Sequence, residues 1–335
     1  MDRSLLRAHL DANSGTAVTI VEAAGMEDFG WLSGRAHEIV VPVASTAAAV
    51  AAPAAVTARG SWPPPASADP VPPGASGLLS ASLAVEPSMV ELVLRRGLPA
   101  LLADWPGPPM WWFVRMRRPY WHLRLRLHTD DYGDAAVRVG RWAVALRQQG
   151  LAGDLRLDTY RPETGRYGDG QAMSAAEELF AADSRAAVAQ MARKDDSWLD
   201  QQALTAASML NLAAAILGSR TAGCEWLVAR PEHAKRAPID RGVLRQAVTL
   251  DPTSLPDPVQ HAWQERSRVA ARYANALSAS SRPLAPAAVL TSLMHLHFVR
   301  AHGPNETAEQ VTYRIARHIA LAAVRRRTRR TGVSR

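Results

Sequence analysis

Hydrophobic and polar positions alternate strictly over residues 122–128, which read His-Leu-Arg-Leu-Arg-Leu-His, and a similar alternation runs from Trp112 to Arg117. Because successive side chains of a strand point to opposite faces of a sheet, this period predicts two strands between Met110 and His128. The leucines of the second strand would face one side of the sheet, and its histidines and arginines the other. A third strand is expected over residues 154–160.

Helical spacing dominates the second half of the chain. One amphipathic helix is expected earlier, over residues 134–149, and Gly150 stands where helices commonly stop. Further helices are expected over residues 175–192, 201–217, 259–277, 286–301 and 307–326. In the last of these, Thr307 and Gln310 have the spacing of a capping box. Strands early and helices late predict an α+β domain, with an antiparallel or mixed sheet in its first half and packed helices following.

Proline, alanine, glycine and serine are densest over residues 46–76, which we interpret as a linker because runs of proline sustain neither helix nor sheet pairing. The segment before it, residues 1–45, holds a plausible helix over residues 3–11 and a β-rich run over residues 38–43. It is too small to bury a core of its own. The main domain is therefore expected over residues 77–335.

The composition is that of a folded globular protein, with 335 residues, 47% hydrophobic and 21% charged. A single cysteine, Cys224, excludes an intramolecular disulfide and a thiolate zinc site, and it fits a reducing, cytoplasmic setting. No apolar stretch is long enough to span a membrane. The net charge of +8 owes much to arginines near the C-terminus, from Arg325 onward, where chains usually fray. This run is weak support for nucleic acid binding.

Several polar side chains are candidates for chemistry. Arg124 and Arg126 share one face of the alternating strand with His122, and burying such a face is costly unless it meets water or an anion. A simply solvated strand face is the alternative. Arg166 lies in a glycine-flanked turn after the third strand, and His295 lies in a polar stripe of a late helix. The sequence has no His-Glu-x-x-His, glycine-rich phosphate loop or Gly-x-Ser-x-Gly motif, which removes the main support for metalloprotease, nucleotide-binding and α/β-hydrolase functions. The tryptophans are expected in the core or at its rim.

These same stretches resemble, in order, the characteristic segments of the elimination domain of class I lantibiotic dehydratases, also called the thiopeptide-type bacteriocin biosynthesis domain. They are Trp112-Phe113-Val114-Arg115, His122-Leu123-Arg124-Leu125-Arg126, Gly165-Arg166-Tyr167-Gly168, and Ser292-Leu293-Met294-His295-Leu296-His297 with Arg300. The resemblance covers roughly residues 77–327. Residues 29–42 are similar to the very end of the glutamylation domain of full-length members. Residues 1–45 are therefore expected to be a remnant of that domain.

In that family, serine and threonine of a precursor peptide are glutamylated from glutamyl-tRNA, and the elimination domain then removes glutamate to leave dehydroalanine or dehydrobutyrine. The resemblance implies catalytic roles for Arg124, Arg126, Arg166 and His295, and no metal or cofactor. It further implies substrate-binding roles, which fall to His122, His297 and Arg300. Histidine suits proton transfer, and arginine grips carboxylates bidentately while staying charged.

The expected partners are a ribosomally made precursor peptide and a separate glutamylation protein or domain. Direct binding of tRNA and binding to a membrane are not expected, and a homodimer is left open. The chain departs from the family pattern at two places. Arg118-Pro119 stands where Asp-Pro is common, and Val299 stands where asparagine is usual before Arg300.

Three other functions stay open. One is a stand-alone relative that joins two dehydroalanines in a formal [4+2] cycloaddition to form the pyridine ring of a thiopeptide. Retention of Arg124, Arg126, Arg166 and His295 favours elimination over this reaction, since a cyclase has no glutamate to expel. The second is a catalytically idle module that binds a leader peptide, for example by adding it to a sheet edge. The third is nucleic acid binding through the arginine-rich end.

Overall fold

The computed structural model describes residues 69–192, 199–230, 237–280 and 283–332 of the chain, and side chains as far as Arg327. The expected helix over residues 3–11, the β-rich run over residues 38–43, the whole segment 1–45 and most of the linker lie outside the described residues. All described residues belong to one compact unit, which begins at Trp62.

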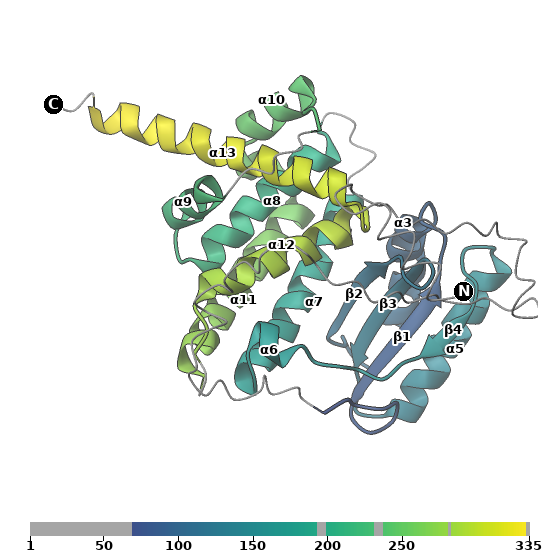
Figure 1. Ribbon diagram of the computed structural model, residues 1–335. Helices are drawn as coiled ribbons and strands as arrows, with labels where there is room; N and C mark the ends of the chain where they lie inside the picture. Colours follow the sequence, from purple (N-terminus) through teal and green to yellow (C-terminus); the bar gives the residue numbers. More distant parts are fainter. Residues whose placement is uncertain (1–68, 193–198, 231–236, 281–282, 333–335) are drawn as a thin grey trace, which may run out of the picture. The chain divides into compact units, whose positions relative to one another are not determined.

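A four-stranded sheet forms the first half of this unit (Figure 1). Its strands are β1 (Leu78–Ala84), β2 (Trp111–Met116), β3 (His122–His128) and β4 (Leu155–Leu157), in the order β2-β3-β1-β4. Every pairing is antiparallel, and packed helices follow along the chain. The expected α+β class and the three expected strands are therefore confirmed, the third as a shorter strand.

The central strand β1 was not predicted, although it pairs with both β3 and β4. Its sequence, Leu-Leu-Ser-Ala-Ser-Leu-Ala, is buried on both faces. Small residues, such as Ser80 and Ser82, stand on the face that carries polar residues elsewhere in the sheet. Alternation between apolar and polar positions is thus too weak in β1 to give a strand signal.

Helices make up most of the rest of the unit. The long ones are α5 (Tyr132–Gln148), α7 (Gln171–Ala192), α8 (Gln201–Ile216), α9 (Arg220–Ala229), α10 (Arg241–Thr249), α11 (Asp257–Ala279), α12 (Pro286–His302) and α13 (Glu306–Gly332). Short helical segments are α3 (Val90–Leu92), η2 (Val93–Gly97), α4 (Leu98–Ala103), α6 (Thr164–Tyr167) and η4 (Pro252–Ser254). The six helices expected within the described residues are all present, while α9, α10 and the segment from α3 to α4 were not predicted.

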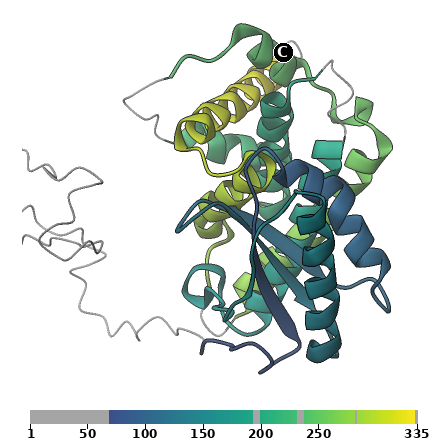
Figure 2. The same ribbon diagram turned by 90° about the vertical axis from the view of Figure 1, so that its right-hand side faces the viewer.

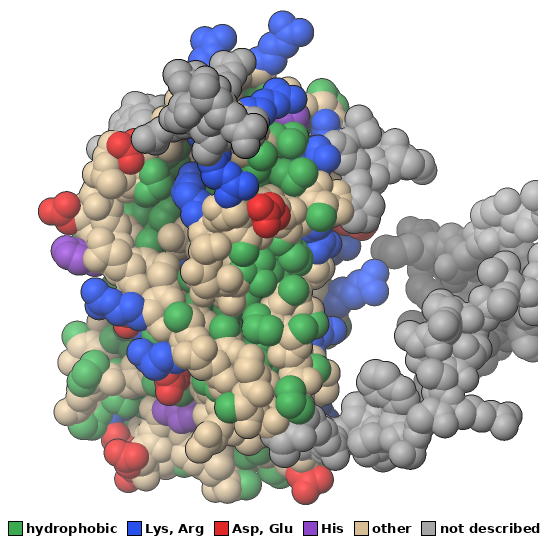
Figure 3. Space-filling model, turned by 90° about the vertical axis from the view of Figure 1, so that its left-hand side faces the viewer, with side chains coloured by type: hydrophobic (Ala, Val, Ile, Leu, Met, Phe, Trp, Pro, Cys, Tyr) green, Lys and Arg blue, Asp and Glu red, His purple; other side chains and the backbone are tan. Residues whose placement is uncertain are grey.

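Two expectations about the last helix were wrong. Asn305 caps α13 by accepting a hydrogen bond from the Ala308 N–H at 3.1 Å, so the capping box at Thr307 does not form. Gln310 instead donates to the Glu306 carboxylate at 3.3 Å. The helix also continues to Gly332 through the arginine-rich run, which was expected to fray. Figure 3 shows the face toward which α13 ends, and arginine side chains gather in its upper part.

The sheet separates two apolar cores. On one face, Leu123, Leu125 and Leu127 of β3 pack with α5 and the segment from α3 to α4, which confirms the predicted direction of these leucines. Figure 2 shows α5 lying against this face of the sheet. Trp112 and Leu78 on the other face join the core formed by α7, α8, α11, α12 and α13. Trp111, Trp112 and Trp142 are buried, as expected for packing residues.

The free edge of β2 is covered by two helices of the bundle. The Phe113 N–H donates to the Ser184 hydroxyl of α7 at 3.2 Å, and the Phe113 carbonyl accepts from Arg300 Nε of α12 at 3.0 Å. Unpaired edge groups invite pairing with other chains, and here two side chains satisfy both backbone groups of Phe113. These hydrogen bonds fix α12 and its Arg300 beside the sheet.

Among the described residues, no single helix is long and apolar enough to cross a membrane. Helices α8 and α9 meet the length and composition criteria only when counted together, and they are bent by 115°.

Candidate functional site

A cavity of about 410 Å³ lies where the polar face of the sheet meets α6 and α12. We call it the arginine cavity. Its charged lining residues are Arg115, Arg117, Arg118, Arg124, Arg126, Arg166, Arg300, Glu163 and His295. Among the described residues that line it, seven are arginines and one is a carboxylate, so the cavity favours an anion. Its volume is that of an ordinary small-ligand pocket.

The antiparallel register aims Arg124 and Arg126 into this cavity. Ser82 stands opposite Arg124 and Ser80 opposite Arg126 on β1, and these small side chains leave space for the guanidiniums. Arg126 lies 4.9 Å from the Tyr160 ring and 6.0 Å from the Trp112 ring. Burial lowers the pKa of Arg126 to about 10, which keeps it charged at neutral pH. The Nε atoms of both arginines are buried, and the described residues offer them no hydrogen-bond partner.

Arg166 reaches the cavity from the short helix α6, where it forms an ion pair with Glu163 at 3.0 Å. Helix α11 holds the backbone of α6, because the Tyr273 hydroxyl donates a hydrogen bond to the Tyr167 carbonyl at 2.8 Å. Gly168 ends α6 with φ of 88°, and a Cβ there would lie 2.7 Å from the Cβ of Ala172. Glycine is thus needed at this turn, which directs Arg166 toward the cavity.

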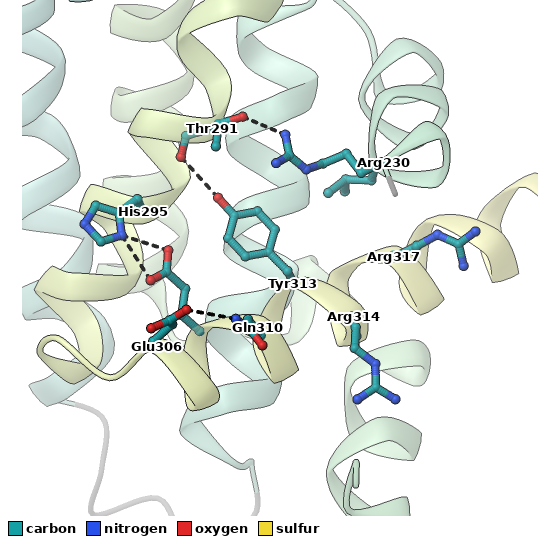
Figure 4. Close-up of a pocket in the computed structure, with 10 residues that line it drawn as sticks. Arg230, Thr291, His295, Glu306, Gln310, Tyr313, Arg314 and Arg317 are labelled. Carbon is teal, nitrogen blue, oxygen red and sulfur yellow. Dashed lines mark hydrogen bonds and ion pairs between the residues drawn. The ribbon is translucent and has the colours of Figure 1, made fainter. Parts of the chain in front are cut away.

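His295 on α12 is half exposed and lines the cavity opposite the sheet. Its Nδ1 lies 2.8 Å and 3.0 Å from the two carboxylate oxygens of Glu309 on α13 (Figure 4). A carboxylate only accepts, so Nδ1 carries the proton and Nε2 is left available. The hydrogen bond to Glu309 raises the pKa of His295 above its ordinary value, against opposing effects of burial and Arg166. This arrangement suits proton transfer near neutral pH.

Arg300 is anchored by a buried carboxylate. Asp183 of α7 accepts from Arg300 Nη1 at Oδ2 and from Arg266 Nη1 at Oδ1, each at 2.8 Å. Arg300 Nη2 is also buried, and it has no hydrogen-bond partner within the described part of the chain. With two guanidiniums and one carboxylate, this buried group of described residues carries a surplus positive charge, and Arg300 presents it to the cavity.

His297 completes the same buried group, since its Nδ1 lies 2.8 Å from Asp183 Oδ1. Burial lowers the pKa of His297, so we treat it as neutral with Nδ1–H donating to Asp183. Burial alone would raise the pKa of Asp183, but His297, Arg300 and Arg266 outweigh it and hold this pKa well below the usual range. We call Asp183, Arg266, His297 and Arg300 the Asp183 network.

The structure thus brings Arg124, Arg126, Arg166, His295 and Arg300 to one cavity, whereas it places His297 and His122 elsewhere. His297 has no exposed surface, and His122 is 4% exposed with its Nδ1 donating to the Tyr120 carbonyl at 2.8 Å. Neither side chain lines the arginine cavity, so the predicted substrate contact of these two residues finds no support there. His297 instead contacts Asp183, and His122 contacts the Tyr120 carbonyl.

Sequence reasoning did not single out Asp183, Glu309 or Arg266 as parts of the site. One signal was present, because Asp183 lies within an alanine-rich, apolar stretch of its helix, where a charge needs a partner. Glu309 gave no such signal, since an acid in the first turn of a helix is common. Both departures from the family pattern, Arg118 and Val299, line the cavity.

Among the described residues, no group of three or more histidine, cysteine, aspartate or glutamate side chains is arranged to hold a metal ion.

Comparison with known proteins gives one family and two related structures. Residues 79–320 match the family described as lantibiotic biosynthesis dehydratase C-term. The tRNA-dependent lantibiotic dehydratase MibB from Microbispora sp. 107891 superposes with a TM-score of 0.63 at 21% identity, over 75% of this chain and 28% of that one. The two share a fold, and the chain spans well under a third of the length of MibB.

The pyridine synthase TbtD from thiomuracin biosynthesis gives a TM-score of 0.48 at 13% identity, over 74% of this chain and 100% of that one. A comparison with curated protein sequences finds no significant match.

Proposed function

Since the chain belongs to the family of lantibiotic biosynthesis dehydratase C-terminal domains, we propose that it eliminates glutamate from glutamylated serine and threonine residues of a ribosomally made peptide. The products are dehydroalanine and dehydrobutyrine. One observation carries this proposal, namely that four arginines and one histidine from β3, α6 and α12 line a single cavity with a strong excess of positive charge.

The reaction needs a base and stabilised anions. The base takes the proton from the peptide α-carbon, the electron pair of that bond forms the double bond to the β-carbon, and the bond from the β-carbon to the ester oxygen breaks. Glutamate leaves with the electrons of that bond as a carboxylate. Negative charge therefore develops on the peptide carbonyl oxygen and on the departing carboxylate, and fixed guanidiniums near both lower the barrier.

His295 is the group we assign to proton transfer. Its Nδ1 is held by Glu309, which fixes the ring orientation and leaves Nε2 to accept the α-proton. Because Glu309 raises the pKa of His295, the neutral imidazole is a stronger base than a free histidine. In many enzymes, too, a carboxylate accepts a hydrogen bond from one ring nitrogen of a catalytic histidine and thereby orients the ring.

The arginines differ in what supports their charge. Arg126 lies beside two aromatic rings and Arg300 belongs to the Asp183 network, so we assign these two to the free carboxylate and the departing carboxylate of the glutamyl group. Arg124 and Arg166 complete the lining, and we assign them to the developing charge on the peptide side of the bond. Because a guanidinium offers paired donors in one plane, lysine would not replace any of these residues equally.

The glutamylated peptide has to come from another protein or domain in this proposal. The chain matches only 28% of the length of MibB, a dehydratase described as tRNA dependent. We propose a precursor peptide and a glutamylating protein or domain as its associates. Such a reaction belongs in the cytoplasm, where ribosomally made peptides arise.

The direct test offers the purified protein a synthetic peptide that carries one glutamylated serine. We expect release of free glutamate and a peptide lighter by one water than its unmodified serine form, measured by mass spectrometry. Arg126→Gln should lower kcat/KM by about 100-fold or more, because a positioned anion-stabilising donor is lost. Arg272→Gln is the control, since Arg272 is exposed, pairs with Glu178 on the helical bundle and lies outside the cavity.

Two outcomes would contradict elimination. Cyclisation of a peptide that already contains two dehydroalanines, with no glutamate released from the glutamylated peptide, would show a [4+2] cyclase. Tight peptide binding without any product, unaffected by Arg124→Ala, Arg166→Ala and His295→Ala, would show an idle binding module.

A further inference from the structure

A second pocket, of about 390 Å³, adjoins the arginine cavity at His295, which lines both (Figure 4). It lies between the end of α9, one side of α12 and the first turns of α13. We call it the Arg230 pocket. Its polar lining comprises Arg230, Thr291, Tyr313, Arg314, Arg317, His295, Glu306, Glu309 and Gln310. No step of the elimination proposed above uses it apart from the contact between Glu309 and His295.

Arg230 is held in a fixed orientation in this pocket. Its guanidinium carbon lies 4.6 Å from the Trp226 ring and 5.5 Å from the Tyr313 ring, and Nη1 donates to the Thr291 hydroxyl at 2.6 Å. Tyr313 is fixed in turn, because its hydroxyl donates to the Thr291 carbonyl at 3.1 Å. Stacking on rings occupies the faces of a guanidinium, but its N–H groups point out of the edge and stay able to bind an anion.

Charge is divided along α13 within the pocket. Glu306 and Glu309 lie at its start, near His295, and both are engaged, Glu309 by His295 and Glu306 by Gln310. Arg314 and Arg317 also line the pocket, one to three turns further along α13, and their guanidiniums point away from that of Arg230 (Figure 4). Among the described residues, Arg230 donates to the Thr291 hydroxyl and Arg314 donates to the Ala237 carbonyl, and both of these acceptors are neutral. The pocket therefore attracts negative charge at one end and repels it at the other.

The spacing of α12 relates this basic end to the reacting position. Thr291, which binds Arg230, precedes His295 by four residues, or about 6 Å along a helix. An extended peptide advances about 3.3 Å per residue. A peptide whose modified residue lies at His295 would thus bring its second or third neighbour to Arg230.

We propose that the Arg230 pocket binds a carboxylate of the peptide substrate, located two or three residues from the residue that is dehydrated. This inference rests on the proposed function, and it adds a specificity rule, namely preference for a nearby acidic position. The carboxylate belongs either to an acidic side chain or to the C-terminus of the peptide, and both sources present the same chemistry to Arg230.

The experiment uses peptides with one glutamylated serine and a single glutamate or glutamine two or three positions away on either side. A second pair ends three residues after the serine as a free acid or an amide. With the wild-type protein, we expect at least one acidic peptide to have a KM about tenfold below that of its neutral partner. The acidic peptide is either one of the glutamate peptides, compared with its glutamine partner, or the free acid, compared with the amide. A charged hydrogen bond would give a difference of this size. In Arg230→Gln and Arg314→Gln, that ratio should fall to about one, while Arg272→Gln should keep it.

An equal KM for the acidic and neutral peptides of every pair would overturn the proposal, and so would a ratio that persists in both pocket variants. A thermal melt of each variant shows whether it is folded. Binding of fluorescent peptides with unmodified serine, measured by anisotropy, gives the same comparison without catalysis. If glutamate is never released, the proposed function fails, whereas the affinity ratio still decides whether the Arg230 pocket binds a carboxylate.

Discussion

At the scale of single residues, the site is governed by how each charge is compensated. A buried carboxylate is tolerated at Asp183 because Arg266, Arg300 and His297 surround it within 2.8 Å. The same contacts leave one positive charge in excess, and Arg300 turns it toward the cavity. Arg126 is compensated differently, by the faces of Trp112 and Tyr160, which attract a cation without neutralising it. Both residues therefore remain able to bind an anion.

The pair of His295 and Glu309 leads to a prediction about pH. As a base, His295 has to be neutral, so the rate of glutamate release should be high above the pKa of His295 and fall as the pH drops through it. Glu309 raises this pKa through its hydrogen bond. Glu309→Gln should therefore move the acid limb of the rate profile to lower pH. The plateau rate should fall about tenfold, because a weaker base remains.

Rates of glutamate release from pH 5 to 9 check this prediction, with Glu265→Gln as the control, since Glu265 pairs with Arg185 on the bundle surface. An acid limb that stays in place or moves to higher pH would show that Glu309 does not tune the base.

At the scale of secondary structure elements, the cavity exists because three of them are held in register. Strand β1 places Ser80 and Ser82 beside the arginines of β3, Gly168 turns α6 toward the sheet, and Arg300 joins α12 to the edge of β2. The Asp183 network is the common anchor, because it links α7, α11 and α12 at one buried point. Elements far apart in sequence are thereby fixed against each other.

We expect Asp183→Asn to destabilise the fold strongly. The change leaves Arg266 and Arg300 buried without a counter-charge, and breaking a buried ion pair from one side costs about 3–5 kcal/mol. Urea unfolding followed by circular dichroism measures the free energy of unfolding, and Arg272→Gln should change it by less than about 1 kcal/mol, since its ion pair is exposed. A loss below about 1 kcal/mol in Asp183→Asn would mean that the network contributes little to packing of the helices.

At the scale of the whole molecule, the residues that match the family model lie within the same compact unit as the described structure. Residues 79–320 carry the match, and all described residues lie within the unit that begins at Trp62. Both cavities and both cores are formed from this unit alone. The assignment of residues 1–45 to a remnant of a glutamylation domain, and of residues 46–76 to a linker, remains a prediction.

A chain that begins at Asp69 should therefore release glutamate from a glutamylated peptide with a kcat/KM within about threefold of the full chain, since none of the proposed catalytic groups is removed. Neither chain should change an unmodified peptide, even when glutamyl-tRNA is supplied. Dehydration of the unmodified peptide by the full chain would contradict the need for a separate glutamylating partner. Loss of glutamate release in the shortened chain would show that earlier residues contribute to the site.

Much of the fold could be predicted from local pattern, since alternation gave β2, β3 and the direction of the leucines, and helical spacing gave six helices. Strand β1 escaped because serine and alanine stand where alternation would show, and its burial comes from neighbours on both sides. Four of the seven arginines among the described residues that line the cavity, and also His295, could be named through resemblance to a family. The contacts of His297 and His122 could not be predicted, because the local pattern shows which face of a helix or strand a residue occupies but not what covers that face.

The sequence by itself determined the class of the fold and the two faces of β3, because both follow from the period of apolar and polar residues. It also indicated the family, because short motifs can be recognised without knowledge of the rest of the chain. The tertiary structure alone decided that Asp183 neutralises part of a buried arginine cluster, that Glu309 orients His295, and that a second basic pocket adjoins the first. These features join residues from different helices. Such contacts depend on packing across the core, which no local period encodes.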